Sequence, residues 1–145
     1  MSRLSIGKWG PVAWDFLHTI AFAYPTEPTL ADKCAMHDFI VAFAAVIPCI
    51  DCRHHFQEMV TRDVHGPSSS AFDTRESISR LTVAWHNRVN MRLGKRLEAY
   101  ETVYARYYPR PRASFPAWWM VAAVAVLMVL GTGLANLPMR RKRKN

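Results

Sequence analysis

The sequence has only three cysteines among its 145 residues, and it shows no internal repeat. Three cysteines are too few for a disulfide-built secreted scaffold, so any oxidising potential would have to come from the chemistry of a site. No stretch alternates polar and apolar residues in the manner of a β-strand. These absences leave a single helical domain with a modest core.

Acidic residues are also scarce, and none of the 11 follows residue 116. Five of the 19 Lys and Arg residues lie in the tail at 139–145. Residues 1–116 therefore carry 14 basic and 11 acidic side chains, a net charge of +3, and the tail adds +5. Such a tail suits anionic lipid head groups, so the charge is poor evidence for a nucleic-acid partner, and we expect none.

One long apolar run, at residues 117–137, contains no charged side chain. As a helix its 21 residues would be about 31 Å long, which matches the hydrocarbon core of a bilayer. A buried core helix is the alternative, but the run has no polar face. We therefore predict a folded domain at 1–108, a proline-rich linker at 109–116, a transmembrane helix at 117–137 and a basic tail at 138–145.

Two signals conflict about which side of the membrane the domain faces. Residues 1–9 lack the apolar region of a signal peptide, and a span near the C-terminus favours insertion after synthesis, with the domain in the cytosol. The five basic residues after the span favour the opposite orientation under the positive-inside rule. We favour a cytosolic domain, because nothing in the sequence would send residues 1–116 across a membrane.

Apolar residues recur at helical spacing in five segments, at about 10–23, 30–47, 49–62, 73–94 and from 96 onward. Asp73, with Glu76 three residues later, resembles a helix N-cap, and residues 64–70 have the composition of a loop. The predicted fold is all-α, a four-helix bundle with a short fifth helix. The predicted inward positions are Trp14, Leu17, His18, Ala21, Met36, Phe39, Ile40, Phe43, Ala44, Ile47, Phe56, Val60, Ile78, Leu81, Trp85, Val89, Leu93, Leu97, Tyr100, Val103, Tyr104 and Tyr107.

The chain is organised around the pair Cys49 and Cys52, which two residues separate. Such a pair can close a small disulfide, and a helix N-terminus would lower the thiol pKa and make the pair reactive. Pro48 fits a helix start at this point. The alternative is a zinc site formed by Cys49, Cys52, His54 and His55, which the spacing alone leaves open although it favours redox chemistry.

A second group of polar residues lies on the predicted fourth helix, at His86, Asn87 and Asn90, with Lys95 just beyond it. A planar, partly polar cofactor needs aromatic faces, a few directed hydrogen-bonding groups and a cation for phosphate. Trp14, His18 and Tyr24 add further side chains of these types.

Taken in order, these motifs resemble the Erv/ALR family of flavin-linked sulfhydryl oxidases. Residues 9–19, WGPVAWDFLHT, are similar to the family's opening helix, Tyr24-Pro25 to its end, and Phe39, Ile40 and Phe43 to its second helix. Residues 48–52 resemble the active-site disulfide, and residues 86–95, HNRVNMRLGK, resemble the FAD-binding helix. The small size, the few cysteines and the basic tail are most similar to versions encoded by large cytoplasmic DNA viruses.

The resemblance implies a homodimer that binds FAD non-covalently, oxidises substrate dithiols and reduces oxygen to hydrogen peroxide. It implies that substrate thiolates attack Cys49 and that Cys52 faces the flavin. The host cytoplasm and the virion membrane are the expected locations. The implied FAD-binding residues are Trp9, Gly10, Trp14, His18, Tyr24, His86, Asn87, Asn90, Lys95 and Tyr100.

The sequence departs from the family pattern at several points. Pro11 stands where many members have arginine, and the cysteines that often follow the Leu-Gly-Lys motif are missing. No second Cys-x-x-Cys is present to act as a shuttle, which indicates a small dithiol or thioredoxin-like protein as the direct substrate. Cys34 is interpreted as a small buried hydrophobe rather than a resolving thiol. A cofactor-free disulfide relay protein remains a further hypothesis.

Overall fold

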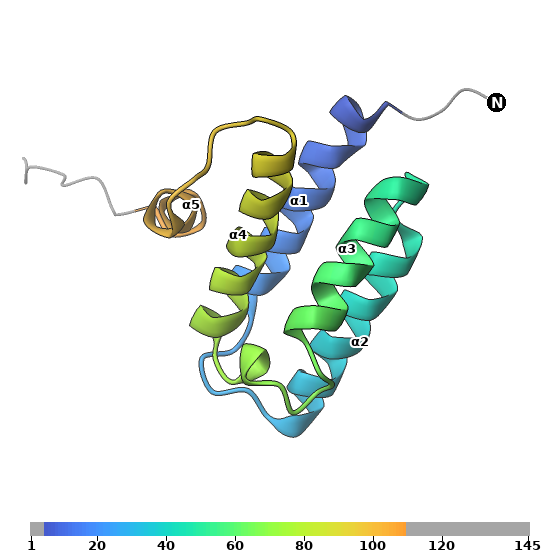
Figure 1. Cartoon of the computed structure of the whole chain (residues 1–145). Helices are drawn as coiled ribbons and strands as arrows, with labels where there is room; N and C mark the ends of the chain where they lie inside the picture. Colours follow the sequence, from blue (N-terminus) through green and yellow to red (C-terminus); the bar gives the residue numbers. More distant parts are fainter. Residues whose placement is uncertain (1–4, 110–145) are drawn as a thin grey trace, which may run out of the picture. The chain divides into compact units, whose positions relative to one another are not determined.

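The computed structural model describes residues 5–109, and its ordered elements are helical. They are α1 (Ile6–Ala23), α2 (Leu30–Val46), α3 (Ile50–Asp63), the short 3-10 helix η1 (Ser70–Phe72), α4 (Arg75–Arg92) and α5 (Tyr100–Tyr107). Figure 1 shows α1 beside α4 and α2 beside α3, with α5 placed across the α1 and α4 side. The prediction of a helical fold with four main helices and a short fifth is confirmed.

The core is built largely from the apolar faces that the periodicity predicts, but Phe22, which is 2% exposed, was not among the predicted inward positions. Trp85, Phe22, Phe72, Leu17, Ile40 and Ile78 are the largest fully buried apolar side chains. Tyr104 on α5 is a wrong prediction, since it is 42% exposed, and so are Leu93 and Leu97, which are 56% and 51% exposed. Both leucines lie beyond the last turn of α4, where the chain has left helical geometry and the helical period no longer decides which side faces the core.

Helix ends in the bundle are closed by short-range contacts. Thr29 and Asp32 form a reciprocal capping box at the start of α2. Thr74, rather than the predicted Asp73, caps α4 by accepting a hydrogen bond from the Ser77 backbone. Asp73 instead accepts from Lys33 of α2 at 2.6 Å. The cap prediction was therefore one residue early, because an acidic side chain serves equally well in a cross-helix ion pair.

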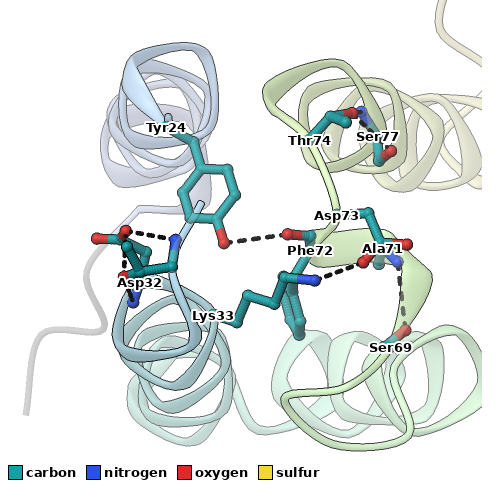
Figure 2. Close-up of polar contacts among 10 residues, drawn as sticks. Tyr24, Asp32, Lys33, Ser69, Ala71, Phe72, Asp73, Thr74 and Ser77 are labelled. Atoms are coloured by element: carbon teal, nitrogen blue, oxygen red, sulfur yellow. Dashed lines mark hydrogen bonds and ion pairs between the residues drawn. The ribbon is translucent and has the colours of Figure 1, made fainter. Parts of the chain in front are cut away.

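Figure 2 shows how that end of the bundle is joined, with Tyr24 at the end of α1 reaching the Phe72 carbonyl and Lys33 reaching Asp73. The Tyr24 hydroxyl donates to Phe72 at 3.1 Å, and the Phe72 ring is fully buried. Phe72 was missed because it lies in a loop-like composition whose single turn, η1, is too short to show a period.

Two helices begin away from their predicted starts. α1 begins at Ile6, ahead of the predicted position 10, and so includes Gly7 and Pro11. Both residue types disfavour helix interiors, and proline cannot donate to the carbonyl four residues earlier, which here belongs to Gly7. α5 begins at Tyr100 rather than at 96, because Glu98 is held in extended chain by Asn87.

Among residues 5–109, no helix is long and apolar enough to cross a membrane. The predicted transmembrane helix at 117–137 and the basic tail at 138–145 lie outside the described residues, as does nearly all of the predicted linker at 109–116.

Candidate functional site

The cysteine pair lies where α2 ends and α3 begins, in a segment that we call the redox turn, residues 47–53. Cys49 is the N-cap of α3, and Cys49 and Cys52 form a disulfide with their Cα atoms 5.2 Å apart. The Cys52 backbone N–H points at the Cys49 sulfur at 3.3 Å. The first N–H groups of a helix lack partners within it and favour negative charge, so this position stabilises a thiolate.

Arg53 holds the redox turn from within α3. Its Nε donates to the carbonyl oxygen of Ile47 at 2.9 Å, and its backbone N–H donates to the carbonyl of Cys49 at 2.8 Å. The Arg53 side chain thus joins Ile47, the C-cap of α2, to the start of α3. The arrangement fixes the backbone on both sides of Cys49 and keeps a guanidinium group in the same turn.

The two sulfurs have different surroundings. Cys52 packs against the buried core cluster, whereas Cys49 lies outside that cluster, beside exposed Val46 and Ile50. Both cysteines are half-buried, and of the two only Cys52 packs against the core cluster. This asymmetry agrees with the roles that the resemblance implies for the two residues.

The side chains of the alternative zinc site are not grouped together in the part of the chain that the structure describes. No three His, Cys, Asp or Glu side chains of residues 5–109 are grouped to hold a metal ion. Cys49 and Cys52 are bonded to each other, and the His55 Nδ1 is hydrogen-bonded to the Asp51 carbonyl of its own helix. His54 is exposed on α3.

A histidine cluster, consisting of Trp14, His18, Thr82 and His86, lies between α1 and α4. His18 Nε2 and His86 Nδ1 are 3.0 Å apart, and His18 Nδ1 lies 3.2 Å from the Thr82 hydroxyl. The Trp14 ring stacks on the His86 ring with centroids 4.3 Å apart and planes 4° apart. The contacts join residues 64 and 68 positions apart, so they depend on α1 packing along α4.

Both histidines are kept neutral by their surroundings. Burial, followed by the nearby His86, lowers the pKa of His18 to about 4. Burial also lowers the pKa of His86. His18 is 4% exposed, so a proton added to it would place a charge in the bundle interior. At neutral pH each ring therefore has one N–H donor and one acceptor nitrogen.

Phe56 links the redox turn to the histidine cluster. It lies one turn after Cys52 on α3, and its ring meets the edge of Trp14 at 5.8 Å and of Trp85 at 5.4 Å. Trp14 then stacks on His86. The disulfide and the histidines are thus connected through packed aromatic rings rather than by an ion pair.

Several predicted cofactor residues lie at the end of α4. Asn90 is 8% exposed, and its side-chain amide is not among the fully buried groups that lack a partner in residues 5–109. Gly94 has a φ of +64°, which lets Lys95 donate its N–H to the Asn90 carbonyl at 2.8 Å and close the helix. The Lys95 side chain remains exposed. A buried asparagine and an exposed lysine therefore lie near the end of this helix.

Other predicted residues have contacts of their own. Asn87 donates to the Glu98 carbonyl and accepts from the Glu98 N–H, which uses both ends of its amide. Tyr100 hydrogen-bonds to Ser79 of α4 at 2.9 Å. Tyr24 is buried and bonded to Phe72, so the structure does not place it in the histidine cluster.

Trp9 and Gly10 lie on the first turns of α1. Trp9 lines an open apolar hollow together with Val12, Phe16 and Pro48, and Pro48 directly precedes Cys49. Gly10 is inside α1, where an added Cβ would meet only the Ile6 side chain at 3.7 Å. Of these two residues, the structure places only Trp9 beside the redox turn, through Pro48.

Thr82 was missed by the sequence analysis, although it is fully buried and contacts His18. The available signal was its spacing, because position 82 lies four residues before His86 on the same face of a predicted helix. A buried hydroxyl on that face needs a partner, and His18 is that partner.

Comparison with known proteins agrees with this geometry. The sequence profile of the Erv1 / Alr family matches residues 11–109. A protein of Acanthamoeba polyphaga mimivirus named as an FAD-linked sulfhydryl oxidase is 28% identical over 122 residues, covering 81% of this chain and 83% of the relative. One of Invertebrate iridescent virus 3, with the same activity in its name, is 26% identical over 139 residues, covering 88% and 92%.

A solved structure shows the same fold. The crystal structure of the FAD binding domain of Erv1 from Saccharomyces cerevisiae is 26% identical, has a TM-score of 0.65, and is matched over 94% of its length and 72% of this chain. A disulfide at the start of α3, a histidine cluster between α1 and α4 and a family profile spanning both lead to one conclusion. This chain belongs to the Erv1 / Alr family.

Proposed function

We propose that the chain is an FAD-linked thiol oxidase that makes disulfide bonds in client proteins. The observation that carries the proposal is the disulfide at the N-terminus of α3, joined through Phe56 and Trp14 to the histidine cluster. The relatives named above share the family and carry this activity in their names.

Client oxidation starts at Cys49, which lies outside the core cluster that Cys52 packs against. A client thiolate attacks the Cys49 sulfur, a mixed disulfide forms and Cys52 leaves as a thiolate. The second client thiolate then attacks the client sulfur of that bond, and Cys49 is released. The client has lost two electrons and gained a disulfide, and the pair Cys49 and Cys52 is reduced. The helix N-terminus stabilises the thiolates at each stage.

The residues present fit a flavin nucleotide. Asn90 offers a side-chain amide on the last turn of α4, Trp14 and His86 offer stacked rings, and Lys95 offers a cation for phosphate. Bound FAD supplies a two-electron acceptor that oxygen can reoxidise, with hydrogen peroxide as the product. Cys52 would pass the electron pair of the reduced cysteines to the flavin, and its packing against the core cluster supports this role.

The direct client is a small dithiol or thioredoxin-like protein. The proposal is supported by the absence of a second Cys-x-x-Cys from the sequence and by the position of Cys49 between exposed Val46 and Ile50. The enzyme acts as a homodimer, held at a virion or host membrane by residues 117–137 with the domain in the cytosol. The apolar run and the basic tail support this placement.

The full chain purified in detergent tests the function directly. It should be yellow, keep flavin absorption after desalting, and oxidise dithiothreitol with one hydrogen peroxide formed per dithiol. A chain that lacks flavin however gently it is isolated contradicts the proposal. A colourless chain that still exchanges disulfides would instead indicate a relay protein.

A further inference from the structure

The hydrogen of the Thr82 hydroxyl sets the direction of a chain of hydrogen bonds. Thr82 donates it to the Ser79 carbonyl at 2.9 Å, within the same helix. A hydroxyl has one hydrogen, and we assign it to the shorter contact, with the Ser79 carbonyl, so the contact with His18 Nδ1 at 3.2 Å is made with the oxygen as acceptor. His18 therefore carries a proton on Nδ1.

The donor and acceptor atoms of His18 determine those of His86. Because burial lowers the pKa of His18 to about 4, the neutral ring has a lone pair on Nε2. That nitrogen lies 3.0 Å from His86 Nδ1, so His86 is the donor of this bond. Neutral His86 then has its own lone pair on Nε2, and no residue of 5–109 hydrogen-bonds to that atom.

We propose that Thr82 is a positioning residue that fixes the tautomers of His18 and His86, so that His86 Nε2 accepts a hydrogen bond from an N–H or O–H group of the bound flavin nucleotide. The inference rests on the proposed function for the identity of the ligand. Thr82 touches neither client nor cofactor in this account and acts through two rings. The ligand groups of the required kind are the adenine amino group, the sugar and ribityl hydroxyls and the ring imide N–H.

Replacing Thr82 by valine should reverse the donor and acceptor roles in the hydrogen bond between His18 and His86. Valine has nearly the shape of threonine but no acceptor, so a proton on His18 Nδ1 would be buried without a partner. Moving the proton to Nε2 satisfies it, because His86 Nδ1 can accept. His86 must then carry its proton on Nε2 and would present a donor to the donor of the ligand. Flavin affinity should fall by roughly tenfold or more.

The test combines ¹⁵N NMR of the histidine rings with flavin titration of the full chain in detergent. In the wild type, both His18 and His86 should be protonated on Nδ1, and Thr82→Ser should keep these tautomers and the flavin affinity. Thr82→Val should place both protons on Nε2 and weaken flavin binding. Thr61→Val, at an exposed position of α3, is the matched control and should change neither the tautomers nor the flavin affinity.

Two results would overturn the proposal. One is an Nε2 proton on His18 in the wild type, which needs no variant and so does not depend on whether Thr82→Val folds. The other is a folded Thr82→Val chain with unchanged tautomers and unchanged flavin affinity. A wild-type chain that binds no flavin would sink the proposed function instead, while the tautomers would still report the part that Thr82 plays.

Discussion

The redox turn and the histidine cluster are built in opposite ways. Contacts in the redox turn join residues three to six positions apart, such as Cys49 with Cys52 and Arg53 with Ile47. Contacts in the histidine cluster join residues 64 and 68 positions apart and lie in the bundle interior. The difference separates two tasks, because clients must reach the first region whereas the second must hold one neutral, fixed hydrogen-bond pattern away from water.

The largest expected effect comes from breaking the redox turn while leaving the cluster intact. Cys49→Ser and Cys52→Ser should each reduce dithiol oxidation to the rate without enzyme, because one sulfur cannot form the disulfide that accepts electrons. Flavin content per chain should stay at the wild-type value. Cys34→Ser, at the half-buried free cysteine of α2, is the control and should retain turnover. Normal turnover in either of the first two variants would remove the pair from the mechanism.

Sequence reasoning succeeded where the interactions are local. Pro48 and the spacing of Cys49 and Cys52 predicted the helix start, because capping depends on residues within one turn. It named His18 and His86 only as separate candidates, since their bond needs α1 and α4 to pack in one register. Thr82 had no local signal beyond its position on a helix face.

The next largest effect is expected from a substitution that breaks the histidine cluster and leaves the redox turn intact. His86→Ala removes the ring stacked on Trp14 and leaves His18 Nε2 without a donor in the interior. We expect the free energy of unfolding to fall by about 3 kcal/mol. Flavin should also be lost, because a ligand that binds only the folded state is linked to its stability.

Flavin per chain after desalting and thermal unfolding measure these two effects of His86→Ala. His65→Ala, at an exposed loop position, is the control and should change neither quantity. Full flavin occupancy in His86→Ala would remove His86 from the cofactor site, whatever its effect on stability.

Low pH should also act differently on the two regions, because the histidine cluster contains a buried titratable group, His18. The pKa of His18 is about 4 in the folded chain and 6.5 in the unfolded chain, so below pH 6.5 the unfolded state binds more protons. Stability from this group is fully present above pH 6.5 and is lost as the pH falls toward 4, by up to about 3 kcal/mol. Thermal unfolding against pH should show a flatter slope in His18→Gln than in the wild type or in His65→Gln. Equal slopes in all three would show that His18 is not held neutral by the fold.

The smallest effect concerns the side chain that holds the redox turn. Arg53→Lys keeps the positive charge but removes the Nε donor to the Ile47 carbonyl, and Arg53→Met removes both. If the hydrogen bond fixes the turn, both variants should lose about 1 kcal/mol of stability. Both should also form the Cys49 to Cys52 disulfide less favourably against a glutathione buffer, with flavin content unchanged. A loss in Arg53→Met alone would assign the effect to charge beside the thiolate, and no change in either would show that α3 and Pro48 hold the turn without Arg53.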